Sequence, residues 1–140
     1  MIICYHGCPQ NVIETLVSGR IDISLGGGEL GRGFYSTLDL WVAKRWALSN
    51  YQSETVLKIE ISDEDFDDLD SLILSKSQVQ FYRKRIKQLK ETRTYRFHRN
   101  IIYSPIVGDR MADKNVFQLK WESKMAERLL NSDAVRRTQI

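Results

Sequence analysis

Apolar and polar positions follow two different periods along the chain, and the shorter period predicts strands at three places. Residues 1–5 and 34–37 are short runs rich in β-branched and aromatic side chains, and apolar residues alternate with charged ones over 57–61. Alternation with period two, or a short apolar run, is typical of a strand that buries one or both faces. We therefore expect strands in these three segments.

The longer, helical period predicts helices in four segments. One begins at Asn11, which we expect to be its N-cap, and ends before Gly19. The others run from an Asp39 cap through Ser49, from about 77 to 92, and from an Asp113 cap through Leu130. In the second of these helices the apolar stripe is expected to be buried and consists of Val42, Ala43, Trp46 and Ala47.

Three weaker segments complete the pattern. Residues 20–25 form a strand or a loop that leads into three glycines, 95–103 are expected to be extended up to Pro105, and Gln139-Ile140 begins a last strand. Mixed strands and helices in one chain of 140 residues predict a single α+β domain with one core.

Composition agrees with an ordinary globular domain, because 42% of the residues are apolar and 28% are charged. No apolar run approaches the roughly 20 residues of a membrane span. The first residues lack the basic start and the continuous apolar stretch of a signal peptide, so we expect a cytoplasmic location.

The cysteines do not predict a metal centre. Cys4 and Cys8 flank His6, but a zinc site usually needs four ligands, and the second histidine, His98, is distant in sequence. We expect two reduced, partly buried thiols and no bound metal.

Charge is spread unevenly, although the net charge is only +3. Residues 63–70 carry six acids, whereas 76–99 carry nine basic residues against the single acid Glu91. A basic amphipathic helix of this kind is either a solvated face or a surface for a phosphate backbone, and the sequence favours neither.

Two glycine-containing stretches carry the chemistry. Tyr5-His6-Gly7 and the segment 31–37 each place a polar aromatic ring beside glycine, where backbone can approach a ligand closely. We expect an imidazole and a phenol to face each other across a cleft. Such a cleft suits a flat, anionic ligand with an amide group, for example a nicotinamide dinucleotide.

These stretches resemble a small bacterial and phage branch of the mono-ADP-ribosyltransferase superfamily, whose site is a His-Tyr-Glu/Asp/Gln triad. Its Tyr-His-Gly strand is similar to residues 5–7, and its Gly-x-Gly-Phe-Tyr-x-Thr block with a following Ala and Trp-Ala is similar to 31–47. Its third block, a strand into Gly followed by Ala-Asp and Val-Phe, is similar to 106–117. The resemblance covers 1–61 and 101–140, while 62–100 does not match.

The resemblance implies an α+β fold, an ADP-ribosyltransferase-like split mixed β-sheet with flanking helices. It implies that His6 hydrogen-bonds the adenosine-side ribose of NAD, that the Gly7 backbone binds the nicotinamide amide and that Tyr35 stacks on the nicotinamide ring. The cofactor-binding residues that it implies are Tyr5, His6, Gly7, Arg20, Arg32, Gly33, Tyr35, Ser36 and Thr37.

Within this set, Arg20 and Arg32 are expected to pair with the pyrophosphate, because a guanidinium matches phosphate oxygens. Ser36 and Thr37 are expected to bond their neighbours and hold the strand end. Residues 26–33 would form a mobile flap over the ligand.

The third triad residue has several candidates. With His6 and Tyr35 as the first two catalytic residues, Gln139 is the preferred third, if the last strand begins near Arg137. If 116–122 is instead a strand with Gln118 and Glu122 on one face, Glu122 is the alternative, although helical spacing favours a helix there. A chain that continues beyond 140 would offer a third source.

Together these features predict an NAD-dependent mono-ADP-ribosyltransferase, a toxin or effector that modifies a protein or nucleic acid, with NAD as substrate. Segment 62–100 would be its docking surface, and an antitoxin or other neutralising protein would be a partner. The alternative is a catalytically degenerate module of the same fold that binds nucleic acid or a partner protein through its basic helix. Hydrolysis of NAD by water would use the same residues.

Overall fold

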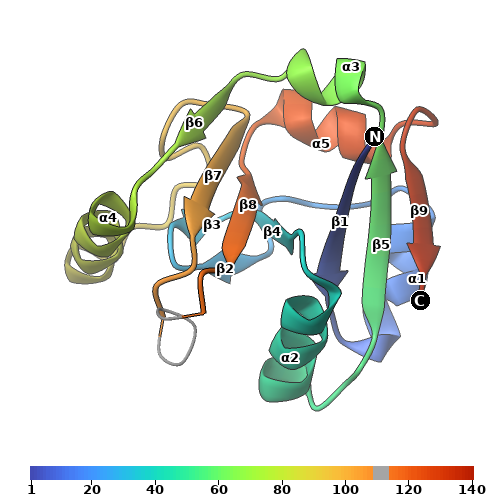
Figure 1. Cartoon of the computed structure of the whole chain (residues 1–140), viewed down its shortest axis with the longest axis horizontal. Helices are drawn as coiled ribbons and strands as arrows, with labels where there is room; N and C mark the ends of the chain where they lie inside the picture. The colour runs from blue at the N-terminus through green and yellow to red at the C-terminus, as the bar shows by residue number, and fades with distance from the viewer. Residues whose placement is uncertain (109–113) are drawn as a thin grey trace.

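The computed structural model of the chain describes residues 1–108 and 114–140. Within these residues a seven-stranded mixed sheet has the order β6-β7-β8-β4-β1-β5-β9 (Figure 1). Neighbouring strands are antiparallel except β6 and β7, which are parallel. The strands are β1 (Ile2–Gly7), β4 (Phe34–Thr37), β5 (Val56–Ile61), β6 (Ser71–Ile73), β7 (Ile101–Pro105), β8 (Phe117–Trp121) and β9 (Arg136–Gln139). A separate hairpin consists of β2 (Gly27–Gly28) and β3 (Gly31–Arg32).

Helices connect and cover the strands, and three of them begin at serine N-caps. Ser62, Ser75 and Ser123 each accept a hydrogen bond from a backbone N–H of the first turn, which satisfies a group that the helix itself leaves unpaired. The helices are η1 (Gln10–Val12), α1 (Ile13–Val17), α2 (Leu40–Tyr51), α3 (Asp63–Asp67), α4 (Lys76–Leu89) and α5 (Lys124–Asn131).

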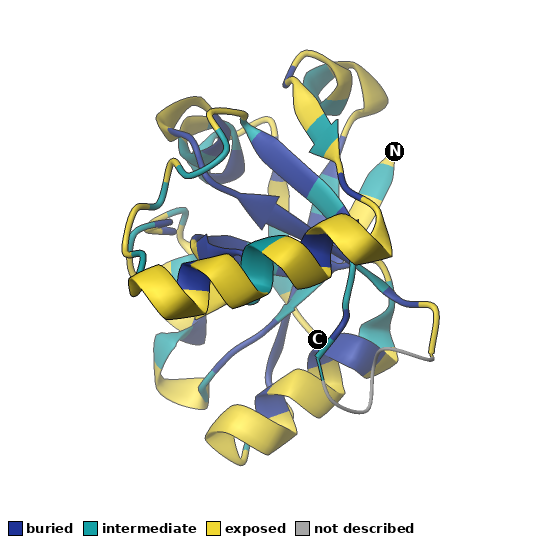
Figure 2. Ribbon diagram, turned by 90° about the vertical axis from the view of Figure 1, so that its left-hand side faces the viewer, coloured by how far each residue is buried: buried dark blue, intermediate teal, exposed yellow. Residues whose placement is uncertain are grey.

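The sheet carries apolar side chains on both faces because helices cover both. On one face, α1, α3 and α5 pack on a core that includes Cys4, Phe34, Ile59 and Trp121. On the other face, α4 packs through Val79 on a smaller core with Leu30, Leu74, Ile102 and Val107. Figure 2 looks onto α4 and shows this division along the helix itself, with buried positions on its inner side and exposed ones outward.

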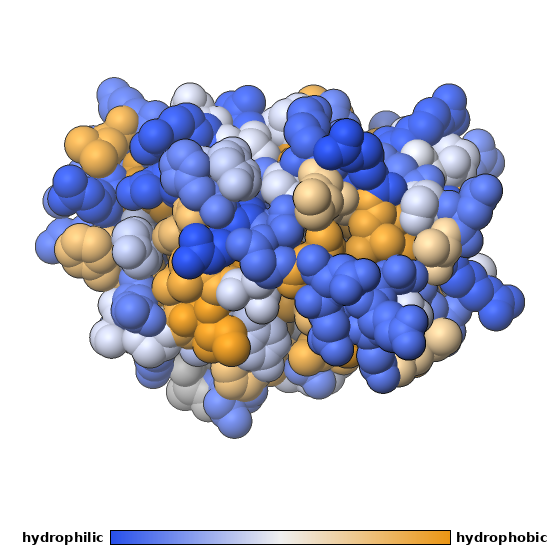
Figure 3. Space-filling view, turned by 90° about the horizontal axis from the view of Figure 1, so that it is seen from above, coloured by the Kyte–Doolittle hydropathy of each residue, from blue (hydrophilic) through white to orange (hydrophobic). Residues whose placement is uncertain are grey.

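The face seen from above Figure 1 is mainly hydrophilic, and its apolar residues are separated into small patches (Figure 3). Among residues 1–108 and 114–140, no helix is both long and apolar enough to cross a membrane.

The α+β class with a mixed sheet and flanking helices is confirmed. The strands expected at 1–5, 34–37 and 57–61 correspond to β1, β4 and β5, and the strand expected to begin at Gln139 corresponds to the end of β9, which begins at Arg136. The helices expected from Asp39 and over 77–92 are α2 and α4.

Several expectations are wrong. The first helix has Val12 rather than Asn11 as its N-cap and follows a 3-10 turn. The helix expected from Asp113 through Leu130 is instead strand β8 followed by α5; Asp113 itself lies outside the described residues. The extended segment 95–103 is a strand only from Ile101, because the residues before it form bends. Trp46 is 44% exposed rather than buried.

Candidate functional site

A cavity of about 880 Å³ lies between α2 and α4, over the ends of β1, β4 and β8. This volume is in the range of small-molecule and cofactor sites in proteins. Of the residues expected to bind a cofactor, six line it: Tyr5, His6, Gly7, Tyr35, Ser36 and Thr37. Further lining residues come from the hairpin, from both helices and from β8, and include Gly28, Glu29, Arg45, Trp46, Arg83, Lys87 and Gln118.

The cavity opens where β1 and β4 part. β1 pairs with β5 along its whole length, but it pairs with β4 only at Tyr5 and Thr37. The N–H of Cys8 donates to the carbonyl oxygen of Thr55, the residue before β5. In an antiparallel ladder, successive residues of a strand direct their backbone N–H and C=O groups to opposite sides. The N–H and C=O of Gly7 therefore point away from β5, into the opening beside β4.

Gly7 also sets how closely α2 approaches the sheet. A Cβ at this position would overlap the carbonyl oxygen of Ala43 and lie 3.1 Å from the Cβ of Ala47. Any side chain here would therefore move α2. Glycine at this position brings the wall of the cavity against the end of β1.

His6 is held by its neighbours on the opposite strand. Its ring stacks on Phe34 with centroids 4.1 Å apart, and its Nδ1 lies 2.5 Å from the carbonyl oxygen of Tyr35. Because a carbonyl oxygen can only accept, Nδ1 carries the hydrogen and the neutral ring keeps Nε2 as an acceptor. Burial lowers the pKa of His6 to about 4, against the opposing effect of this hydrogen bond.

Tyr35 is enclosed by the β2–β3 hairpin. Its hydroxyl donates to the carbonyl oxygen of Gly31 at 2.6 Å and accepts from the N–H of Leu30 at 3.1 Å. A Cβ on Gly28 would lie 2.6 Å from the Tyr35 ring, so glycine allows the hairpin to lie against the phenol. Burial raises the pKa of Tyr35 well above its usual value, which keeps the hydroxyl protonated.

The imidazole and the phenol do not face each other as expected. His6 is on the face of the sheet that carries Cys4 and Phe34, whereas Tyr35 is on the face that carries the hairpin. Both residues nevertheless line the same cavity, because the opening between β1 and β4 lies between them.

Gln118 is a lining residue that sequence reasoning did not place in the site. It lies opposite Thr37 on β8, is 7% exposed, and donates from its side-chain nitrogen to the carboxylate of Glu29 at 3.1 Å. Glu29 also accepts from the backbone N–H of Val107 at 2.9 Å. Since a carboxylate only accepts, the amide of Gln118 must present its NH₂ to Glu29, and its oxygen is left for another donor.

The signal that could have found Gln118 is the alternation over 117–122. Three apolar residues alternate there with Gln118, Lys120 and Glu122, which is a strand pattern.

One aromatic residue and three cations complete the walls. Trp46 and Arg45 come from α2, and Arg83 and Lys87 come from α4. The guanidinium of Arg83 lies 4.0 Å from the carboxylate of Glu29, whose side chain is 12% exposed. The cavity therefore combines a large aromatic ring with a positively charged rim.

Two hydroxyls near the site are engaged by the protein. Ser36 accepts a hydrogen bond from the indole of Trp121 at 2.9 Å, and Thr37 donates to the carbonyl oxygen of Phe117 at 3.0 Å. These bonds join β4 to β8 at the edge of the cavity.

The remaining expected site residues do not line this cavity. Arg20 bonds Ser18, Arg32 lies on the exposed side of the hairpin, and Gly33 packs against Lys120, where a Cβ would lie 2.8 Å from its Cε. Gln139 lies on β9 and lines a separate cavity of about 730 Å³. The structure therefore does not bring Gln139 to His6 and Tyr35.

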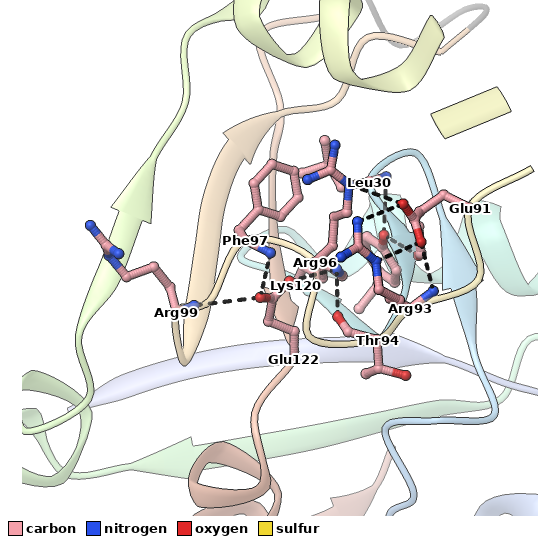
Figure 4. Close-up of polar contacts among 11 residues, drawn as sticks. Leu30, Glu91, Arg93, Thr94, Arg96, Phe97, Arg99, Lys120 and Glu122 are labelled. Atoms are coloured by element: carbon pink, nitrogen blue, oxygen red, sulfur yellow. Dashed lines mark hydrogen bonds and ion pairs between the residues drawn. The ribbon is translucent and has the colours of Figure 1, made fainter. Parts of the chain in front are cut away.

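Glu122, the alternative third residue, is occupied elsewhere. Its carboxylate accepts from Lys120 at 2.6 Å and from the backbone N–H of Phe97 at 2.8 Å, and both charged side chains are fully buried (Figure 4). Lys120 also donates to the carbonyl oxygen of Thr94 at 3.0 Å. Glu122 therefore fastens segment 91–100 to β8 and does not reach the cavity.

The two cysteines are buried free thiols. Burial raises the pKa of Cys4 to about 12 and that of Cys8 to about 11, so both are protonated at neutral pH. In the part of the chain that the structure describes, no three His, Cys, Asp or Glu side chains gather where they could share a metal ion.

No protein-family model matches the chain, and no curated protein matches it significantly. The geometry of the cavity therefore carries the functional argument.

Proposed function

We propose that the cavity binds NAD and that the protein transfers ADP-ribose from it to a macromolecular acceptor. One observation carries this proposal. The backbone of Gly7, the ring of Tyr35 and the amide of Gln118 come from three adjacent strands and line one cavity with a cationic rim. The combination suits a ligand with an amide, an aromatic ring, ribose hydroxyls and phosphates.

The nicotinamide end of NAD would bind at the opening between β1 and β4. The Gly7 N–H would donate to the carboxamide oxygen, and the Gly7 carbonyl would accept from the carboxamide NH₂. Tyr35 and Trp46 would contact the ring, and each stacked aromatic contact contributes about 0.5–1.5 kcal/mol beyond the area it buries.

The riboses and phosphates would extend from this point. The free Nε2 of His6 would accept from a hydroxyl of the adenosine-side ribose. The side-chain oxygen of Gln118, fixed by the bond to Glu29, would accept from the 2′-hydroxyl of the nicotinamide ribose. Arg45, Arg83 and Lys87 at the rim would balance the pyrophosphate, in place of Arg20 and Arg32.

The reaction needs no covalent protein intermediate. The bond between C1′ of the ribose and the nicotinamide nitrogen breaks, and its electron pair stays on the nicotinamide. A nucleophile of the acceptor attacks C1′ and loses a proton, giving nicotinamide and the ADP-ribosylated acceptor. The transition state resembles the oxocarbenium ion of glycoside hydrolysis. The carboxylate of Glu29 beside Gln118 would supply negative charge near this cation.

The same observations support an ADP-ribosyltransferase-like fold. Of the two glycine-containing stretches on which the family resemblance depends, the first lies at the end of β1 and the second runs from β3 of the hairpin into β4, and the neighbouring strands β1 and β4 part at the cavity. The roles of toxin or effector, the cytoplasmic location and an antitoxin partner stay predictions from the resemblance and the sequence.

A matched pair of glutamines tests the proposal. Purified protein is incubated with NAD, and nicotinamide release is measured by chromatography for the wild type, Gln118→Ala and Gln139→Ala. We expect Gln118→Ala to lower kcat/KM by about 100-fold, typical of losing one preorganised group at developing charge. Gln139→Ala, outside the cavity, should match the wild type.

Loss of activity only in Gln139→Ala, or no binding of NAD by the wild type in calorimetry, would overturn the proposal. Binding of NAD without release of nicotinamide, with or without cell lysate as a source of acceptor, would favour the catalytically degenerate module. Release without any labelled acceptor would favour hydrolysis.

A further inference from the structure

Helix α4 presents most of its surface to solvent. In Figure 2 it crosses the front of the molecule, and only a narrow inner stripe is buried. Val79 and Ile86 form that stripe, whereas Phe81 is 58% exposed. In the described structure, α4 therefore has a large solvent-exposed face next to the cavity.

The charged residues on the exposed face of α4 are all basic. No acidic residue occurs between Ser71 and Lys90, while the same stretch carries six basic residues. Among the described residues, one ion pair involves a cation of this stretch. In it the guanidinium of Arg83 lies 4.0 Å from the carboxylate of Glu29. Its remaining positive charges, on Lys76, Lys84, Arg85, Lys87 and Lys90, therefore have no ion-pair partner within residues 1–108 and 114–140.

Spacing arranges part of this charge in a line that ends at the cavity. Lys76, Arg83 and Lys87 are separated by seven and four residues, which is close to whole turns, so they occupy one side of the helix. Arg83 and Lys87 line the cavity. From Lys76 to Lys87 the line is about 16 Å long at 1.5 Å per residue.

A second group of α4 side chains lies outside the cavity, on the solvent-exposed side of the helix. Lys84 and Arg85 follow Phe81 by three and four residues, so their side chains flank its ring on the helix surface. An exposed aromatic ring between two cations suits a stacked base whose phosphates are bound on both sides. An acidic polypeptide would use the cations but would not need the ring.

We propose that the exposed face of α4 binds single-stranded nucleic acid and presents it to the cavity as the acceptor of ADP-ribose. The assignment of an acceptor rests on the proposed transferase function, but the binding itself does not. Lys84, Phe81 and Arg85 bind the strand outside the cavity, and the line through Lys76 leads it to the rim.

The test measures binding without NAD. A fluorescein-labelled 20-nucleotide single-stranded RNA, and the same sequence as DNA, are titrated by fluorescence anisotropy at several salt concentrations. The variants are Lys84→Glu/Arg85→Glu and Phe81→Ala, with Lys124→Glu/Arg128→Glu as control. The control makes the same change of charge on exposed residues of α5, which covers the other face of the sheet.

We expect the α4 double variant to bind at least about tenfold more weakly and to show a smaller dependence on salt, because each phosphate contact contributes a slope of about 0.7 on single strands. Phe81→Ala should weaken binding at least about fivefold, since a stacked base contributes about 1–3 kcal/mol. The α5 control should bind as the wild type does.

Equal affinity of the two double variants, or no binding to either oligonucleotide at low salt, would overturn the proposal. Equal affinity for polyglutamate of the same length would overturn it in favour of an acidic protein partner. Nicotinamide release without an acceptor is measured in parallel on both double variants. If the oligonucleotides do not bind but nicotinamide is released, the acceptor proposed here is wrong and the proposed reaction stands. If the oligonucleotides bind but no nicotinamide is released, the binding surface stands and the proposed reaction is wrong.

Discussion

The amide nitrogen of Gln118 donates to the carboxylate of Glu29 across 3.1 Å, and this bond joins β8 to the glycine hairpin at the floor of the cavity. The hairpin is therefore fastened at two points, here and at the hydroxyl of Tyr35. Gln118, which we place against the nicotinamide ribose, and Glu29, which carries a negative charge beside it, therefore hold each other in position.

A second carboxylate at position 118 should make stability depend on pH. In Gln118→Glu two carboxylates would lie side by side where this hydrogen bond now is. Their mutual repulsion disfavours the state in which both are ionised. The pair would hold a proton in the folded state that the unfolded chain releases above its ordinary pKa of about 4.3. The free energy of unfolding should therefore fall as pH rises, by at least about 1 kcal/mol from pH 5 to pH 8 relative to the wild type.

Urea denaturation at both pH values measures this change. The control Gln139→Glu places the same charge on β9, away from Glu29, and should follow the wild type. An equal pH dependence of the two variants would show that Gln118 and Glu29 are not in contact.

The two exposed tryptophans of α2 offer a test of the aromatic wall. Trp46 is 44% exposed and lines the cavity, whereas Trp41 is 47% exposed and does not line it. Trp46→Ala should weaken NAD binding about tenfold, since a stacked aromatic contact and its buried area together contribute about 1.4 kcal/mol or more. Trp41→Ala should bind NAD as the wild type does.

Calorimetric titration with NAD measures both affinities. Because each ring is about half exposed, both variants should unfold within a few degrees of the wild type, which separates binding from folding. Equal loss of affinity in both variants would mean that the ring of Trp46 has no special place in the site.

Glycine at position 7 should be required for the position of α2. In Gly7→Ala the new Cβ would overlap the backbone of Ala43, which cannot move without the helix. Overpacking of this kind typically costs about 1–3 kcal/mol, and NAD affinity should fall with it. Gly27→Ala is the control, because nothing lies within 4 Å of a Cβ there.

Thermal unfolding and NAD titration of the two glycine variants check this expectation. If Gly7→Ala kept both the stability and the NAD affinity of the wild type, the close approach of α2 to the end of β1 would be contradicted.

His6 should stay neutral through the physiological range. Its pKa is lowered to about 4 by burial, whereas an unfolded histidine titrates near 6.5. Above pH 6.5 both states are neutral; as pH falls toward 4 the unfolded chain gains the proton first. His6 therefore lowers the free energy of unfolding over this window, by no more than about 3 kcal/mol.

Denaturation at pH 7 and pH 5 should accordingly show a smaller pH dependence in His6→Gln than in the wild type. The ring signals of His6, followed by NMR, should not titrate between pH 8 and pH 5. A midpoint near 6.5 would contradict the partly buried, hydrogen-bonded ring.

Local signals in the sequence were enough for β1, β4, β5, α2 and α4, because in each the period of apolar residues and the neighbouring polar residues favour one structure. The same signals conflicted at β8. Apolar residues from Val116 to Leu130 fit a helix, yet β8 takes up only 117–121 and α5 begins at Lys124. Tertiary contacts favour the strand, because the buried side chains of Gln118 and Lys120 find hydrogen-bond partners on the hairpin and on segment 91–100.

The same limit applies to the site. Residues 5–7 and 35–37 line the cavity because their strands place them there, and sequence motifs sufficed to find them. Two of the three cations at the rim could not be found in this way, because Arg83 and Lys87 reach the cavity through the packing of α4 on a distant strand. Arg20 is closer in sequence to the motifs and Arg32 lies within one of them, but neither lines the cavity.

The buried pair of Lys120 and Glu122 limits how this protein can be recombined with others. A chimera that replaced 91–100 with an unrelated loop would remove the carbonyl of Thr94 and the N–H of Phe97, and would leave both charges short of hydrogen bonds. A buried polar group that loses its hydrogen-bond partner destabilises a protein by about 1–3 kcal/mol, and by more where the group is charged. A graft that exchanges segment 91–100 must therefore also exchange residues 120 and 122. This part of the chain, which does not match the family resemblance, and the end of strand β8 thus have to be transferred together.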